Sequence, residues 1–378
     1  MDNRVINENQ LIEMLKKAKN ILLIEPPYRR SYIPLGLAKI STFAKSNGAK
    51  ITYSRGIIPG NFNLICITSM FTNDSDKVLK VIHDCQNGLL LNNVPVIVGG
   101  IYASIMSKHV LKNTSKNLYV FTGHSKILDS YLPDYDLDYG MSGFFNNVMT
   151  LFTTRGCVNK CAYCMVWRME QEYYICPNWK GNIENIDREV CMVSDNSFLS
   201  APHEHIKNVI HCLNENNKKV IFNNGMNCRE INDKNAKLLA SLKYTRQGFR
   251  IGFDRIKDDG HYQKAMEKLQ KAGLKLSGNS YTYVLYNFEE TPQDAYYRAT
   301  EAWKFKSNPY LMRYRPLNQT HKKLDYIGKY WTKNLIRAFS YYGSTFGYNR
   351  GDKTFEGWMK SSDIKLTNED WDKWNYRR

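Results

Sequence analysis

The stretch that decides the fold, "LFTTRGCVNKCAYCMVW" (residues 151–167), joins a short strand pattern to Cys157, Cys161 and Cys164. Thiols this dense in a chain with no secretory signal predict a metal site rather than disulfides, because cytosolic reductants keep thiols free. A structural zinc site usually takes four ligands in two pairs, and no second CxxC or HxxxH follows here. Three thiolates suit an iron–sulfur cluster whose fourth iron is bound by another molecule.

The chain has 378 residues, of which 43% are hydrophobic and 24% charged, as is typical of a globular protein with room for two domains. Its polar start, "MDNRVINENQLIEMLKKAKN", predicts an amphipathic helix rather than a signal peptide or membrane span, and hence a cytoplasmic location without a membrane partner. Six further cysteines are scattered singly, and most are expected to be buried: Cys66, Cys85, Cys176, Cys191, Cys212 and Cys228.

From residue 20 onward, short apolar runs alternate with amphipathic segments, which predicts parallel strands joined by helices. The runs are Ile21–Pro27, Lys50–Gly56, Asn63–Phe71, Val94–Gly100 and Leu118–Gly123. They predict a doubly wound α/β domain over residues 1–140, with its ligand crevice at the carboxyl ends of the strands. Residues 132–140 lack a period and are interpreted as a linker.

A second alternation over residues 148–318 predicts a partial (β/α)6 barrel, open rather than closed. Asn232 and Thr291 stand at helix N-cap positions, and Gly273 stands where a helix should end. The expected strands are Leu151–Gly156, Val190–Asn196, Lys219–Gly225, Gly248–Asp254, Leu276–Asn287 and Tyr310–Asn318. Such barrels carry their chemistry on the loops after the strands. Residues 319–378 would form a short C-terminal extension.

The segment "CVNKCAYC" resembles the CxxxCxΦC signature of the radical S-adenosylmethionine (SAM) superfamily, with Tyr163 in the aromatic position. The resemblance implies that Cys157, Cys161 and Cys164 hold three irons of a 4Fe-4S cluster and that SAM chelates the fourth. A reductant such as flavodoxin or ferredoxin would supply an electron. Reductive cleavage of SAM would then give a 5′-deoxyadenosyl radical that abstracts hydrogen from a substrate. The alternative is three cysteines on a structural metal loop.

Two further segments are similar to this superfamily. "VSDNSF" (residues 193–198) is similar to a "DDNF"-type strand ending, which implies that Asp195 and Asn196 receive the amino group of the methionine moiety, although Asn196 could simply turn the chain. "YNFEET" (residues 286–291) stands where relatives often have a GxPGET-like turn, and implies that Glu290 faces the ribose or adenine.

The remaining strand ends are expected to bind cofactor and substrate. Asn223, Asn224 and Asp254 are short polar residues that could orient a bound molecule. Arg313 and Arg315 alternate along a strand, so they could share one face and bind a phosphate or carboxylate, or else be surface cations. We take Asp254, Arg313 and Arg315 as the catalytic candidates.

Cations also flank the cysteines. Arg155 and Lys160 could favour a reduced cluster, or they could be solvated loop cations.

The N-terminal half resembles the cobalamin-binding-like Rossmann domain that precedes the barrel in one branch of this superfamily. The matching segments are "PPYRRSYIPLGLAKISTFAKSNG" (residues 26–48), "ITSM" (residues 67–70) and the Gly99–Gly100 pair. The DxHxxG motif that supplies a ligand to cobalt is absent, and no histidine precedes His83. The sequence therefore disfavours cobalamin, although binding without a protein ligand stays open.

The net charge is +17, and residues 303–350 carry +9 of it. Cations interleaved with rings suit unpaired nucleic acid, so a nucleic acid or nucleotide is one expected substrate. A peptide or small metabolite is the alternative, as is a non-catalytic nucleic-acid-binding protein braced by a metal; the charge could also reflect composition alone. The twelve rings are Trp303, Phe305, Tyr310, Tyr314, Tyr326, Tyr330, Trp331, Phe339, Tyr341, Tyr342, Phe346 and Tyr348.

Overall fold

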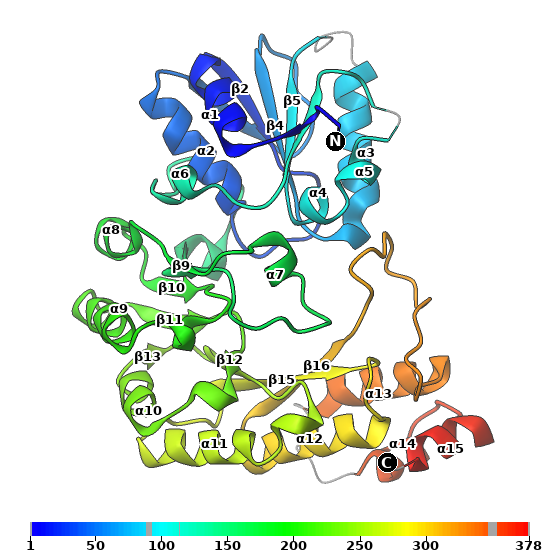
Figure 1. Cartoon of the computed structure of the whole chain (residues 1–378). Coiled ribbons are helices and arrows are strands. Elements are labelled where there is room, and N and C mark those ends of the chain that lie inside the picture. The colour runs from blue at the N-terminus through cyan, green and yellow to red at the C-terminus, as the bar shows by residue number, and fades with distance from the viewer. Residues whose placement is uncertain (1, 88–92, 113, 347–353, 377–378) are drawn as a thin grey trace. The chain divides into compact units, whose positions relative to one another are not determined.

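The computed structural model describes residues 2–87, 93–112, 114–346 and 354–376 (Figure 1). The chain divides into two compact units, each described by itself. Unit 1 comprises Met1–Thr150, Arg155–Asn182 and Leu317–Lys323. Unit 2 comprises Leu151–Thr154, Ile183–Pro316 and Leu324–Arg378. The cysteine segment thus belongs to unit 1, and the predicted domain limits at residues 140, 148 and 318 stay a prediction.

Unit 1 is built on a six-stranded parallel sheet with the order β1-β6-β5-β4-β2-β3. Its strands are β1 (Val5–Ile6), β2 (Asn20–Ile24), β3 (Lys50–Ser54), β4 (Leu64–Ser69), β5 (Val96–Gly100) and β6 (Leu118–Phe121). The five predicted apolar runs all form strands. The sequence did not reveal β1, because its two residues are too few to show a period.

Helices cover both faces of this sheet (Figure 1). Side chains alternate between the faces of a strand, so Leu22 and Ile24 pack with α3, α4 and α5, while Ile21 and Leu23 pack with α1, α2 and α6. The two hydrophobic cores make this a doubly wound α/β unit. The helices are α1 (Glu8–Lys17), α2 (Leu35–Ser46), α3 (Ser75–Asn87), α4 (Ile101–Ile105), α5 (Ser107–Val110) and α6 (Lys126–Asp129).

The segment interpreted as a linker, residues 132–140, has no helix or strand but is packed within unit 1. Asp134 is buried and accepts a hydrogen bond from Ser41 of α2, and Lys45 pairs with it at 2.6 Å. Buried Tyr139 donates its hydroxyl to the Asp134 carbonyl at 2.8 Å. The segment is therefore fixed by polar contacts that no periodic pattern announces.

Unit 2 contains parallel strands in two sheets, ordered β13-β11-β10 and β12-β14-β15-β16. The Phe222 amide of β11 donates to the Gly248 carbonyl at 2.8 Å, which links the sheets just before β14. The strands are β10 (Val190–Val193), β11 (Lys219–Phe222), β12 (Met226–Asn227), β13 (Lys243–Tyr244), β14 (Phe249–Gly252), β15 (Ser280–Tyr286) and β16 (Asn308–Arg313). Of β7 (Val148–Leu151), only Leu151 belongs to unit 2. The fold is thus α/β with parallel strands; its description as a partial barrel stays a prediction.

Helices connect these strands, and the expected caps are present. Asn232 accepts from the Asn235 amide at 2.9 Å, and Thr291 accepts from the Asp294 amide at 3.1 Å. Gly273 follows α11 with a φ of +98°, a conformation that favours glycine. The helices are α9 (His203–Glu215), α10 (Asp233–Ala240), α11 (His261–Lys271), α12 (Pro292–Lys304), α13 (Lys333–Phe346), α14 (Phe355–Lys360) and α15 (Asn368–Asn375).

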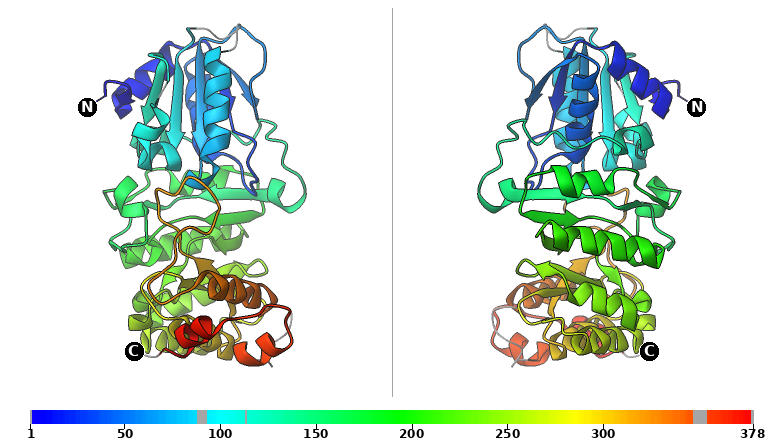
Figure 2. Two further views of the ribbon diagram at one scale, coloured as in Figure 1. Left: turned by 90° about the vertical axis from the view of Figure 1, so that its right-hand side faces the viewer. Right: turned by 90° about the vertical axis from the view of Figure 1, so that its left-hand side faces the viewer.

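The C-terminal helices form a hydrophobic core with β15 and α12 (Figure 2). Trp331, Phe339 and Tyr342, which the sequence suggested as stacking surfaces for bases, are buried in this core. Tyr310 and Tyr341 are 52% and 62% exposed. The side chain of Phe346 and all of Tyr348 lie outside the described residues. The aromatic content of the C-terminal stretch therefore largely reflects packing. None of the helices in the described ranges is long and apolar enough to cross a bilayer.

Candidate active site

The three cysteines lie on one loop of unit 1, between β8 (Thr154–Arg155) and β9 (Tyr174–Ile175), with the short helix α7 (Val166–Met169) after the third. All three are partly exposed free thiols. The Asn159 amide donates to Cys157 Sγ at 3.4 Å, and the Val166 amide donates to Cys164 Sγ at 3.4 Å. Such N–H donors favour a negatively charged sulfur.

The base of this loop is closed by one carboxylate. Glu170 accepts from the Gly156 amide at 2.8 Å and pairs with Arg155 at 3.3 Å, and its side chain is only 3% exposed. Gly156 has a φ of +76°, and a Cβ there would lie 2.2 Å from the Glu172 carbonyl oxygen. The two ends of the cysteine loop therefore meet at a glycine that no other residue replaces without strain. We call Arg155, Gly156 and Glu170 the loop clamp.

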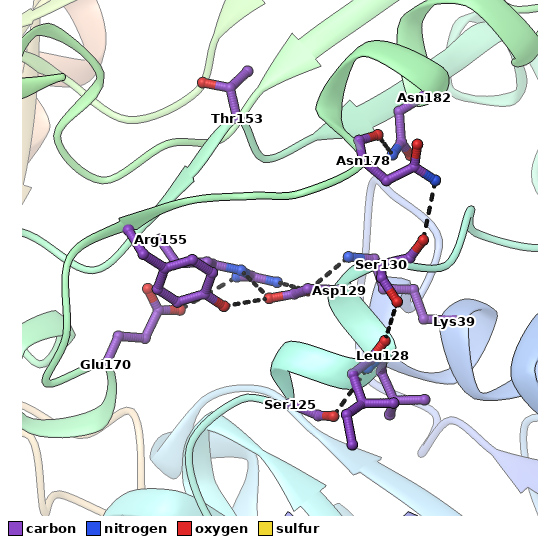
Figure 3. Close-up of polar contacts among 12 residues, drawn as sticks. Lys39, Ser125, Leu128, Asp129, Ser130, Thr153, Arg155, Glu170, Asn178 and Asn182 are labelled. Carbon is purple, nitrogen blue, oxygen red and sulfur yellow. Dashed lines mark hydrogen bonds and ion pairs between the residues drawn. The ribbon is translucent and has the colours of Figure 1, made fainter. Parts of the chain in front are cut away.

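The loop clamp is anchored to α6 and α2 of unit 1 through Asp129 (Figure 3). Asp129 pairs with Arg155 at 2.9 Å and with Lys39 of α2 at 2.7 Å, and Tyr174 donates its hydroxyl at 3.0 Å. Burial would raise the pKa of Asp129, but the Arg155 and Lys39 charges hold that pKa well below its usual range. Two cations and two carboxylates thus balance one another in a buried network.

This network contradicts one of the two interpretations of Arg155. Its guanidinium is 12% exposed and engaged by two carboxylates, so it is not a solvated cation. Its effect on a cluster stays a prediction. Lys160 is exposed, as a loop cation should be. Tyr163, the aromatic residue of the motif, lies between Cys161 and Cys164 in the sequence, and its side chain is partly buried.

Burial raises the pKa of the Cys164 thiol, the Val166 amide opposes that effect, and the neighbouring Cys161 and Cys157 sulfurs raise the pKa further. Throughout the described part of the chain, no group of three or more His, Cys, Asp and Glu side chains is arranged to hold a metal ion. The fit to an iron–sulfur cluster therefore rests on the donor set. Three thiols on one clamped loop, with N–H donors to two of them, have the chemistry that such a cluster requires.

In unit 2, Asp195 follows β10 and is fully enclosed. Its carboxylate accepts from the Thr153 amide at 2.6 Å and from the Thr153 and Thr154 hydroxyls. Burial raises the pKa of Asp195 to about 6, although these hydrogen bonds oppose the rise. His205 Nε2 lies 3.2 Å from the Thr153 hydroxyl oxygen. The carboxylate thus accepts hydrogen bonds from residues of unit 2 itself. A contact of Asp195 with SAM stays a prediction.

The amides of two other predicted residues meet beside it. Asn224 donates to Asn196 Oδ1 at 2.9 Å and to the Ser194 carbonyl at 2.8 Å. The ends of β10 and β11 are therefore bridged by side-chain amides. Both residues are partly exposed, so they can also bind a polar ligand.

The second sheet of unit 2 has one face covered by helices and one that is partly exposed. Phe249, Ile251 and Phe253 are fully buried, and the Phe253 ring stacks on Tyr262 of α11 at 4.5 Å. The alternate residues Arg250, Gly252 and Asp254 face the other side and are only partly buried. We call that side the open face; on β15 and β16 it also carries Tyr281, Tyr283 and Tyr310, which make edge contacts at 5.7 Å.

Arg250 is the cation of the open face. Its guanidinium donates to Asn223 Oδ1 and to the Tyr283 hydroxyl, both at 2.9 Å, and the Tyr283 hydroxyl donates to the Asn223 carbonyl at 2.8 Å. These partners are neutral, and the buried Nε of Arg250 has no hydrogen-bond partner among the described residues. Sequence reasoning found Asn223 but missed Arg250. The signal was a single charge within the strand pattern "GFRIGFD".

Arg313 and Arg315 lie close together, as their alternation predicted. Burial lowers the pKa of Arg315, and the charge of Arg313 lowers it further. The strand register pairs Arg313 with Tyr286, whose ring packs on Phe339 of α13. Arg313 therefore lies on the helix-covered face rather than the open face. A catalytic role for these arginines stays a prediction, but the register favours Arg250 as the cation facing a ligand.

Glu290 binds within unit 2 rather than standing exposed. It accepts from the Ile256 amide at 2.9 Å and pairs with the buried Arg298 at 3.0 Å and with Arg255 at 3.3 Å. It thereby connects the loop after β14 to α12. A contact to ribose or adenine would have to share this carboxylate.

The predicted residues thus fall into two groups. The cysteines and Tyr163 belong to unit 1, whereas Asp195, Asn196, Asn223, Asn224, Asp254 and Glu290 belong to unit 2. No protein-family description matches this chain, and no curated protein matches it.

Proposed function

We propose that this chain is a radical SAM enzyme whose cluster is held by Cys157, Cys161 and Cys164. The observation that carries the proposal is the cysteine loop: a CxxxCxΦC segment of free, partly exposed thiols, closed at its base by the loop clamp. A bound 4Fe-4S cluster would supply the electron that cleaves SAM reductively.

The residues of the chain would bind and orient the reacting groups. The Asn159 and Val166 amides donate to two of the three sulfurs, which favours an electron-rich site. In unit 2, we propose that the paired amides of Asn196 and Asn224 bind a polar ligand, which fits their partial exposure at neighbouring strand ends. Within each of the two adjoining sheets, the parallel strands of unit 2 follow chain order, which fits a partial barrel.

The proposal is tested by loading the protein with iron and sulfide without oxygen. Cys157→Ala, Cys161→Ala and Cys164→Ala should each lose the cluster and all formation of 5′-deoxyadenosine, because a three-thiolate site has no spare ligand. Cys85→Ala and Cys212→Ala are matched controls, since both thiols are buried elsewhere. Normal iron content in Cys161→Ala would contradict the assignment, and a bracing zinc site would show no visible absorption.

For the substrate, we propose an anionic group bound at Arg250, with the rings of the open face beside it. Burying a guanidinium among neutral partners is unfavourable unless an anion joins it, and a phosphate or carboxylate matches its fork of donors. Millimolar inorganic phosphate or citrate should raise the Tm of the wild-type protein but not of Arg250→Gln. Arg246→Gln, at an exposed neighbouring position, should behave as wild type. An equal shift in Arg250→Gln would refute this site.

For unit 1, we propose a cobalamin-binding-like architecture that does not use the cofactor. In a doubly wound sheet the ligand crevice lies where the strand order reverses, here between β2 and β4. Glu25, directly after β2, is fully buried and pairs with Arg30 at 2.7 Å. Because the DxHxxG motif is absent and this buried ion pair stands at the crevice, we propose that no corrinoid is used, and no step is assigned to one. A cobalamin complex that survives gel filtration would contradict this view.

A further inference from the structure

Unit 1 contains a cavity of about 710 Å³ that is lined on one side by the cysteine loop. Its wall includes Arg168, Met169 and Gln171 from the end of that loop, and Lys108 and Lys112 from α5 and the turn after it. The guanidinium of Arg168 donates to the Cys164 carbonyl and, at 3.3 Å, to the Ala162 carbonyl. The cavity wall is therefore hydrogen-bonded to the backbone of a proposed cluster ligand.

The charge of this cavity is positive. Asp2 is the single acidic residue in its lining, and it pairs with Arg4 at 2.8 Å. Lys108, Lys112 and Arg168 are exposed, and none of them has an ion-pair partner among the described residues. Three uncompensated cations around one concave surface create a local positive potential that attracts acidic molecules.

We propose that this basic cavity is where an acidic, one-electron carrier protein of the flavodoxin or ferredoxin class docks. The inference rests on the proposed function, because a carrier has a reason to dock here only if the cysteines hold a cluster. The carrier is oxidised by one electron, and the cluster bound by Cys157, Cys161 and Cys164 is reduced by one electron. No bond forms or breaks in this step, and no proton needs to move.

The test measures reduction of the loaded enzyme in an anaerobic stopped-flow instrument, using photoreduced flavodoxin and, separately, dithionite. The Lys108→Glu/Lys112→Glu variant should lower the second-order rate with flavodoxin about tenfold at low ionic strength, because steering by complementary charge accelerates association by at least that much. Its rate should also depend less on salt. The dithionite rate should be unchanged, because this small reductant needs no docking surface.

Lys16→Glu/Lys17→Glu is the matched control. It makes the same charge change in exposed residues of α1, on the sheet face opposite α5. Equal flavodoxin rates in the two variants would overturn the docking proposal. The proposal would also be overturned if Lys108→Glu/Lys112→Glu lost inorganic phosphate binding but kept the wild-type flavodoxin rate, because the cavity would then be a small-anion site. Failure of the wild-type protein to hold any cluster would overturn the proposed function, and this inference with it.

Discussion

Replacing Glu170 by glutamine tests the loop clamp most directly. The change keeps the shape of the side chain and an oxygen that can accept from the Gly156 amide, but it removes one of the two buried carboxylates. Lys39 and Arg155 then share Asp129 alone, which leaves a net positive charge in the buried network. Removing one member of a buried ion pair typically costs 3–5 kcal/mol, and we take about 3 because Arg155 keeps one partner.

A loss of about 3 kcal/mol in loop closure raises the population of open loop roughly 100-fold. Iron release from the loaded protein to a chelator should accelerate by up to that factor, followed as loss of visible absorption without oxygen. Glu172→Gln is the control, because Glu172 lies on the same segment but is exposed and pairs with surface Lys126. If Glu170→Gln released iron no faster than Glu172→Gln, the loop clamp would not control access to the site.

Three further predictions concern Asp195, the C-terminal core and the basic stretch. Burial raises the pKa of Asp195 to about 6, whereas in the unfolded chain this carboxyl loses its proton near pH 4. The contribution of Asp195 to the free energy of unfolding therefore falls as the pH rises from about 4 to about 6, and it is constant above that. Asp195→Asn should therefore match wild type in urea unfolding at pH 4 and exceed it by about 3 kcal/mol at pH 7, whereas a constant difference would contradict the argument. Phe339→Ala should cost about 3–5 kcal/mol, because the ring is fully buried, while Tyr341→Ala, in a residue 62% exposed, should change unfolding little; similar effects would mean that the C-terminal core is not formed. If the basic stretch binds single-stranded RNA or DNA, neutralising exposed Lys323, Lys329 and Lys333 should flatten the salt dependence by up to ~2 units of log–log slope. Wild-type protein without salt-dependent affinity would exclude a polynucleotide substrate.

Local patterns predicted the regular elements well, because their physical causes are local. The runs around Leu22 and Ile65 are apolar on both faces, as strands covered on two sides must be, and Asn232 and Thr291 cap helices through neighbouring amides. The ring pattern of the C-terminal stretch was misread. Trp331, Leu335, Phe339 and Tyr342 recur at helical spacing, which indicates a buried helix face more directly than a stacking surface.

The arrangement of the site could be predicted only in part. The cysteine spacing identifies the thiols, but nothing in sequence joins Arg155 to Asp129 or Lys39, because those contacts depend on tertiary packing. The strand register is the second feature that the sequence does not show. Arg313 and Arg250 look equivalent as charges near strand ends, and only the pairing of Arg313 with Tyr286 shows that they face opposite sides of the sheet.

The anchoring of the cysteine loop at Asp129 has a consequence for the order of events during synthesis. Lys39 and Asp129 leave the ribosome before the three cysteines of the loop, and the N-terminal part of a chain generally folds first. The residues that anchor the loop can thus be folded before the loop itself emerges from the ribosome. Arg155 can then pair with Asp129 as soon as it is synthesised. A fragment that begins after residue 150 would carry the three thiols but lack that seat, so separate expression of the C-terminal part should yield a loop without its anchor.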